Sequence, residues 1–110
     1  MAARDSAAIA GGVSEATLVD RAGGAVARAA RRLLGGTYGR RVVIVCGKGN
    51  NGADGRVAGQ LLASWGARID RFDLAGLDHA ALGRALERAD LAVDAMFGTG
   101  FRGALTIRVR

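Results

Sequence analysis

The chain has 110 residues, half of them hydrophobic but only 5% aromatic, so it can form one domain with a core of alanine, valine and leucine. Its formal charge is +6, but the arginines are scattered without interleaved aromatic residues, and we therefore expect no nucleic-acid partner. The single cysteine, Cys46, excludes an internal disulfide framework, fits a reducing compartment and is expected in the core. No run of residues is apolar for long enough to span a membrane, so we expect a cytoplasmic protein without a membrane partner.

The first part of the chain predicts two helices. Residues 5–10 favour a short helix, and a longer one begins after Ser14, whose side chain can cap it, and ends at Gly35 and Gly36. Gly23 and Gly24 in its middle lower its stability, which either a close contact with another backbone or simple tolerance would explain. The apolar residues that follow at helical spacing are Leu18, Ala22, Val26, Ala29 and Leu33.

The rest of the chain predicts three strands that alternate with two helices. The first strand, Arg41–Cys46, is apolar without alternation, as expected when helices cover both faces of a sheet. Right-handed crossovers then give parallel strands in the order 2-1-3, in a Rossmann-like three-layer αβα fold with a mostly parallel sheet. The later elements are a helix over 54–65 ended by Gly66, a more polar strand over 67–74 near an edge, a helix capped by Asp78 that includes Leu82 and Leu86, and a strand over 90–96.

A glycine-rich loop follows the first strand. Gly47, Gly49 and Gly52 match the spacing G-x-G-x-x-G between a buried strand and a helix, which lets a phosphate approach the backbone and the helix N-terminus. By itself this spacing has low specificity for dinucleotides, although Asp70 or Asp73 near the end of the second strand could reach a ribose hydroxyl. The loop is not a P-loop, because no Gly-Lys-Ser/Thr follows.

Polar side chains distinguish this loop from an ordinary nucleotide-binding loop. Asn50 and Asn51 bring amide groups, and Asp54 brings a carboxylate that a helix N-cap would also explain. Asp94, near the end of the third strand, either ties down the following loop or belongs to a site; we favour the site, because ligands bind outside the carboxyl ends of such strands. In the 2-1-3 order these four residues and Thr99 converge on one crevice. Their oxygen atoms suit a hard cation better than zinc or copper, and no Ser-His or Cys-His catalytic pair can be assembled.

Three motifs resemble those of a known family. Residues 47–55 (GKGNNGADG) resemble the G-x-G-N-N-G-G-D-G loop of the YjeF N-terminal domain family, the NAD(P)H-hydrate epimerases. Residues 93–100 (VDAMFGTG) resemble its V-D-A-x-F-G-T-G motif, and residues 18–23 (LVDRAG) resemble its L-M-E-x-A-G helix. The motifs occur in order from about residue 7 to residue 105, so the resemblance implies a single YjeF N-terminal-like domain over residues 1–110.

The resemblance implies an isomerase that interconverts the R and S epimers of hydrated NADH and NADPH, so that a dehydratase can repair the S form. It implies a potassium ion as cofactor, with Asn51 and Asp94 as its ligands. The expected partners are the hydrated cofactor, a dehydratase domain and further copies of the chain. The resemblance does not identify the group that transfers the proton. By residue matching, the substrate contacts are Asn50, Asn51, Gly52, Ala53, Asp54, Gly98, Thr99, Gly100, Phe101, Arg102, Gly103 and Ala104.

The sequence departs from the family pattern at three places. Ala53 replaces the second glycine of the loop, which costs strain if that position needs a positive φ and little otherwise. The stretch between Leu74 and Asp90 is shorter than usual, and the D-I-P-S-G-type motif is absent. We therefore expect a C-terminally truncated domain, or a fragment of an epimerase–dehydratase fusion, whose third strand is an uncovered edge.

These departures leave open whether the chain is an enzyme by itself. The alternative is a non-catalytic nucleotide-binding or scaffold module derived from the same family. An ordinary NAD-binding half of a dehydrogenase is disfavoured by Asn50, Asn51 and the loop at Asp94, and a basic nucleic-acid binder comes last.

Overall fold

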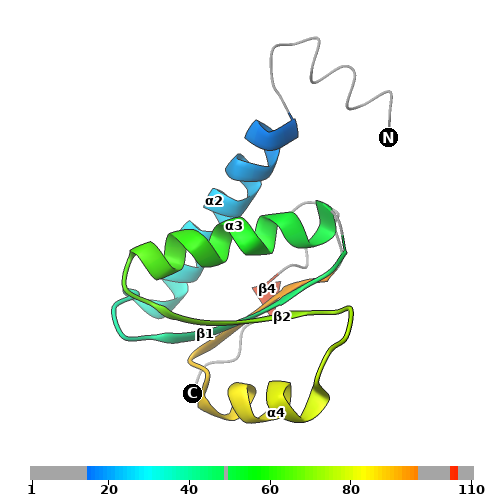
Figure 1. The fold of residues 1–110 in the computed structure, drawn as a ribbon. Helices are drawn as coiled ribbons and strands as arrows, with labels where there is room; N and C mark the ends of the chain where they lie inside the picture. The colour runs from blue at the N-terminus through cyan, green and yellow to red at the C-terminus, as the bar shows by residue number, and fades with distance from the viewer. Residues whose placement is uncertain (1–14, 49, 97–104, 107–110) are drawn as a thin grey trace.

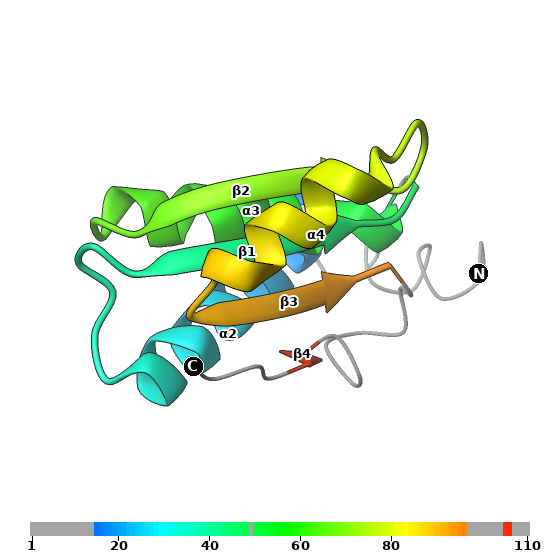
Figure 2. The same ribbon diagram turned by 90° about the horizontal axis from the view of Figure 1, so that it is seen from below.

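The computed structural model describes residues 15–48, 50–96 and 105–106. A four-stranded sheet lies between two layers of helices (Figure 1, Figure 2). Helices α2 (Glu15–Leu34) and α3 (Asn50–Ser64) cover one face, and α4 (His79–Arg88) covers the other. This arrangement confirms the predicted three-layer αβα fold. The short helix predicted over residues 5–10 and the predicted cap at Ser14 lie outside the described residues.

The sheet combines parallel strands with one antiparallel strand. β1 (Arg41–Cys46) pairs in parallel with β2 (Arg68–Asp73) on one side and with β3 (Leu91–Ala95) on the other, which confirms the order 2-1-3. A fourth strand, β4 (Leu105–Thr106), pairs antiparallel with β3. The prediction that the third strand would be an uncovered edge is therefore wrong. An open strand edge offers a row of unpaired N–H and C=O groups. On the edge of β3, the residues Ala92 and Val93 pair with β4.

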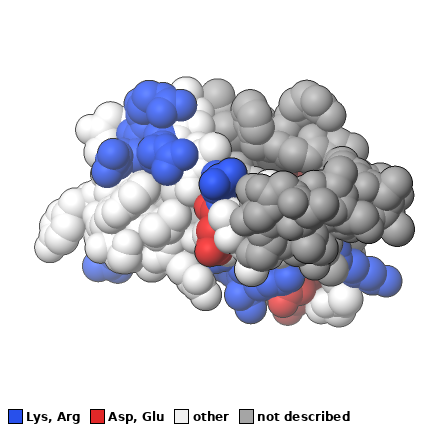
Figure 3. Space-filling view, turned by 90° about the horizontal axis from the view of Figure 1, so that it is seen from above, with Lys and Arg blue, Asp and Glu red and all other residues white. Residues whose placement is uncertain are grey.

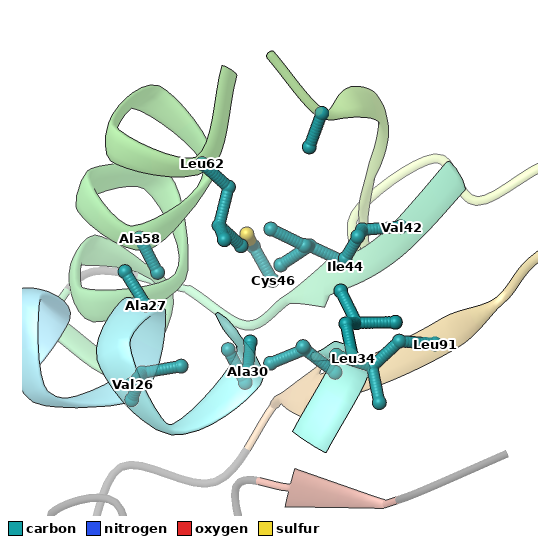
Figure 4. Packing of buried hydrophobic residues seen from close by; sticks show 13 residues of the cluster. Val26, Ala27, Ala30, Leu34, Val42, Ile44, Cys46, Ala58, Leu62 and Leu91 are labelled. Atoms are coloured by element: carbon teal, nitrogen blue, oxygen red, sulfur yellow. The ribbon is translucent and has the colours of Figure 1, made fainter. Parts of the chain in front are cut away.

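Both faces of β1 are covered by helices. Val42, Ile44 and Cys46 pack into the cluster formed with α2 and α3, which Figure 4 shows from close by. Val43 and Val45 alternate with them and pack on the side of α4. This double burial explains why the strand sequence shows no alternation of apolar and polar residues.

The predicted start of α4 and the predicted end of α2 are confirmed. The Asp78 side chain caps α4 by accepting a hydrogen bond of 3.0 Å from the backbone N–H of Ala81. Gly35 and Gly36, which follow α2, have φ values of 69° and 135°, a conformation that glycine adopts without a steric penalty. None of the helices in the described ranges is both long and apolar enough to cross a membrane.

Helix α2 buries a face that overlaps only in part with the predicted stripe, which it shares at Val26. Its buried apolar residues are Val26, Ala27, Ala30 and Leu34, whereas Leu18 and Leu33 at the ends of the predicted stripe are 39% and 45% exposed. The helix packs against α3, and its contact face includes the buried glycine at position 23. The two largest side chains of the predicted stripe therefore do not define the buried face.

Gly23 marks the closest approach of α2 to α3. A Cβ atom at this position would lie 2.5 Å from Val57 Cβ and 3.0 Å from the backbone carbonyl oxygen of Asp54. The same atom at Gly24 would meet only the end of the Arg28 side chain, at 3.1 Å. A close contact with another helix thus explains Gly23, and tolerance explains Gly24.

We predict opposite effects for alanine at these two neighbouring positions. Gly23→Ala should lower the free energy of unfolding by about 1–3 kcal/mol, because the added methyl group overpacks the contact between α2 and α3. Gly24→Ala is the matched control and should raise it by up to about 1 kcal/mol, because alanine is the better helix former. Urea unfolding followed by circular dichroism measures both. Equal effects of the two substitutions would contradict the close contact at Gly23.

Candidate functional site

The glycine-rich loop lies directly against the end of β3. The backbone N–H of Gly47 donates a 3.0 Å hydrogen bond to the carbonyl oxygen of Ala95. A Cβ atom on Gly47 would collide with the backbone carbonyl of Met96, so this position has no room for a side chain. The loop after the first strand and the end of the third strand, which the sequence predicted to form one site, are therefore neighbours.

Helix α3 begins at Asn50, four residues before the predicted start at Asp54. Asn50 and Asn51 thus form its first turn, where backbone N–H groups have no partner within the helix. The N-cap explanation of Asp54 is wrong, because this residue lies inside the helix. Ala53 carries no strain, since no non-glycine residue in the described ranges has a positive φ.

Three glycines allow α3 to lie close to the sheet. A Cβ atom on Gly55 would lie 2.7 Å from Ala95 Cβ and 3.0 Å from Cys46 Sγ. A Cβ atom on Gly59 would lie 3.2 Å from Ile44 Cδ1, and one on Gly52 would collide with the carbonyl oxygen of Gly47. The helix therefore rests on β1 and on the end of β3 without intervening side chains at these positions.

Asp54 is a half-buried carboxyl group in the second turn of α3. Burial raises the pKa of Asp54 above the ordinary aspartate value. A carboxyl group that keeps its proton to higher pH can donate a hydrogen bond, or pass a proton, where an ordinary aspartate would be ionised. Perturbed carboxyl groups of this kind are concentrated at functional sites, although structural positions also produce them.

Asp94 has a structural contact at the end of β3. Its Oδ1 accepts a 2.9 Å hydrogen bond from the backbone N–H of Met96, so the carboxylate ties down the start of the following loop. The second oxygen, Oδ2, is then the atom that would reach a cation. In the described part of the chain no three His, Cys, Asp or Glu side chains are grouped closely enough to hold a metal ion. A hard cation here would have to combine this carboxylate with amide and carbonyl oxygens.

Cys46 fits the predicted core position. The residue is buried at the end of β1, and burial, followed by the negative charge of Asp73, raises the pKa of its thiol against the opposing charges of Arg56 and Arg71. A thiol whose pKa is raised stays protonated and is a poor nucleophile.

Sequence reasoning missed Arg56, which it counted among the scattered arginines. The Nη1 atom of Arg56 lies 2.9 Å from the position that a Cβ on Gly52 would occupy, so the guanidinium group reaches back to the glycine turn. The sequence offered one signal, the spacing of four residues between Gly52 and Arg56, because residues four apart share one face of a helix. The second predicted loop, Gly98, Thr99, Gly100, Phe101, Arg102, Gly103 and Ala104, lies outside the described residues.

Charge is divided over the face formed by α2 and α3. Figure 3 shows the basic side chains of the described residues in separate groups, with acidic side chains next to some of them, and not as one continuous stripe. Phosphate-binding grooves of nucleic-acid proteins need a continuous basic surface.

Comparisons with known proteins place the chain in one family. The family described as YjeF-related protein N-terminus matches residues 15–80. A bifunctional NAD(P)H-hydrate repair enzyme Nnr of Thermofilum pendens is 36% identical to this chain. The match covers 81% of this chain and 22% of the length of that enzyme. A protein of the same name from Moorella thermoacetica is 38% identical over 67% of this chain and 19% of its own length.

A shorter relative has a single named activity. The NAD(P)H-hydrate epimerase of Ajellomyces capsulatus is 32% identical over 86% of this chain and 48% of its own length. The chain thus spans about half of the epimerase and about a fifth of the two bifunctional enzymes. No solved structure gives a significant match.

We predict that Asp54→Asn stabilises the protein at neutral pH. Because the pKa of Asp54 is raised in the folded state, the ionised carboxylate is disfavoured there, and the stability of the wild type falls as the pH rises from 3.8 through the folded pKa. The variant should therefore unfold at higher urea than the wild type at pH 7 and lose this advantage below pH 3.8. Asp20→Asn, the same change at an exposed site of α2, is the control. An Asp54→Asn protein no more stable than wild type at pH 7 would contradict the raised pKa.

Proposed function

This chain belongs to the family of YjeF-related protein N-termini, and on that basis we propose that it forms the NAD(P)H-hydrate epimerase domain of a nicotinamide cofactor repair enzyme. It would interconvert the R and S epimers of hydrated NADH and NADPH. The observation that carries the proposal is the hydrogen bond between Gly47 and Ala95, because it joins the loop after β1 to the end of β3 at the edge where ligands of α/β sheets bind.

The substrate contacts that we propose come from both glycine-rich loops. Residues 50–54 include the first turn of α3, whose backbone N–H groups have no partner within the helix and suit the phosphates of a dinucleotide. Residues 98–104 would supply the remaining contacts. Of the described carboxyl groups at this edge, Asp54 is the first candidate for proton transfer, because it is half-buried and its pKa is raised.

We propose potassium as the cation of this site, with Asn51 and Asp94 as ligands. The support is the chemistry of the donors: Oδ1 of Asp94 is held by the Met96 N–H, and Oδ2 remains for a hard cation, for which amide oxygens are also suitable. A bound potassium ion would supply positive charge beside a phosphate-bearing substrate. Asp94 also orders the loop backbone at Met96, so its two oxygens have separate tasks.

The wider setting follows from the relatives and is likewise a proposal. Two of them are named as bifunctional repair enzymes, so we infer that a dehydratase, fused or separate, uses the S epimer. Residues 1–110 would form a single domain that acts as a homo-oligomer. The buried free thiol of Cys46 fits a reducing compartment, in line with a cytoplasmic location.

The test of this function is an epimerisation assay on purified R-NADHX, with and without potassium. We expect potassium-dependent appearance of the S epimer from folded wild-type protein. Binding of the hydrated cofactor without turnover would contradict catalysis by this chain and favour the non-catalytic nucleotide-binding or scaffold module. Neither binding nor turnover would overturn the proposal.

We predict that Asp94→Asn removes the potassium dependence while leaving the protein folded. The amide oxygen of asparagine can still accept the hydrogen bond from Met96, but the negative charge for the cation is lost. The expected loss of potassium affinity is at least about tenfold, the cost of removing even an outer partner of a metal site. Asp90→Asn, near the opposite end of the same strand, is the charge-matched comparison. Unchanged potassium dependence in Asp94→Asn would contradict the assignment.

A further inference from the structure

Arg56 lies where α3 meets the glycine turn. It follows Gly52 by one helical turn, and its Nη1 atom lies 2.9 Å from the Cβ position of that glycine. The same position is 3.1 Å from Cys46 Cβ and in contact with the carbonyl oxygen of Gly47. The guanidinium group therefore lies beside the turn that connects β1 to α3, and it can do so because residue 52 has no side chain.

Two further charged side chains lie near the same turn. Cys46 pairs with Asp73 across the parallel β1–β2 ladder, so the end of β2 lies next to the end of β1. The Cys46 thiol experiences the charges of Asp73, Arg56 and Arg71 together, which brings all three within electrostatic range of one buried atom. Arg71 also forms a 3.8 Å ion pair with Asp73. Arg56 and Arg71 thus lie with Asp73 near the ends of β1 and β2.

We propose that Arg56 binds a phosphate group of the hydrated dinucleotide and sets the affinity of the site for its cofactor. This inference rests on the proposed function for the identity of the ligand. A guanidinium group offers a planar fork of donors that matches two phosphate oxygens. It stands beside the first turn of a helix, where backbone N–H groups also favour an anion.

Two phosphate groups of the ligand could meet this arginine. The pyrophosphate is common to hydrated NADH and NADPH, and in folds of this type it lies at the glycine turn. The 2′-phosphate is present only in the NADPH form, and an arginine near the end of the second strand can accommodate it. Arg56 lies beside the glycine turn, and the end of β2 pairs with the end of β1 next to that turn, so the arrangement is compatible with either source.

The test is a calorimetric titration of wild-type and Arg56→Gln protein with hydrated NADH and hydrated NADPH at low salt. We expect the variant to bind about tenfold to a hundredfold more weakly, the usual cost of one charge-assisted hydrogen bond. Equal losses for both ligands assign the pyrophosphate, and a loss for hydrated NADPH alone assigns the 2′-phosphate. Unchanged affinity for both ligands would overturn the inference.

Two further variants separate binding from folding. Arg84→Gln removes the same charge from an exposed position of α4 and should bind like the wild type. Arg56→Lys keeps the charge without the planar fork and should show a smaller loss, which decides the matter if Arg56→Gln does not fold. If the wild-type protein binds the hydrated dinucleotide without epimerising it, the proposed epimerase activity is wrong. The comparison of the affinities of wild type and Arg56→Gln then still tests the role of Arg56.

Discussion

The whole site depends on how closely α3 approaches the sheet, and that distance is set by glycines. Glycine inside a helix costs about 1 kcal/mol relative to alanine, yet α3 contains Gly52, Gly55 and Gly59 on the side that faces β1 and β3. An added Cβ at Gly55 would lie 2.7 Å from Ala95, so any side chain there would push the helix away from the end of the third strand. The close packing in turn holds the backbone of Gly47 against Ala95 and Met96.

This packing determines which groups meet at the carboxyl edge of the sheet. The first turn of α3, whose N–H groups have no partner within the helix, follows the short loop after β1, and Asp94 lies near the end of the neighbouring strand β3. Because the helix is so close, Asp54 is half-buried and its pKa is raised, while Arg56 extends back over a glycine instead of being blocked by a side chain. The edge thus brings together the groups that the proposed site would use, namely N–H donors for the phosphates of a ligand and the carboxylate of Asp94 for a hard cation.

The strands were predictable because burial on both faces imposes an apolar run, as in Arg41–Cys46, and because parallel strands need crossover helices. The cap at Asp78 was predictable because it depends on local geometry alone. The start of α3 was not predictable, since Asn50 and Asn51 are poor helix formers, and the close packing of Gly52 and Gly55 against neighbouring elements cannot be read from the sequence. The buried face of α2 depends on contacts with elements far apart in the sequence, which helical spacing cannot reveal. The position of Arg56, by contrast, follows from its spacing of one helical turn after Gly52.

The most direct measurement is a titration of the isotope-labelled protein with hydrated NADPH in the presence of potassium, followed through the backbone amide signals in heteronuclear NMR spectra. If the two loops form one site on the closely packed α3, the largest shifts will fall on residues 47–55 and on Asp94 to Met96, while those of α4 beyond its first turn stay unchanged. Shifts concentrated elsewhere, or no shifts with the ligand in large excess, would contradict a ligand site at this edge of the sheet.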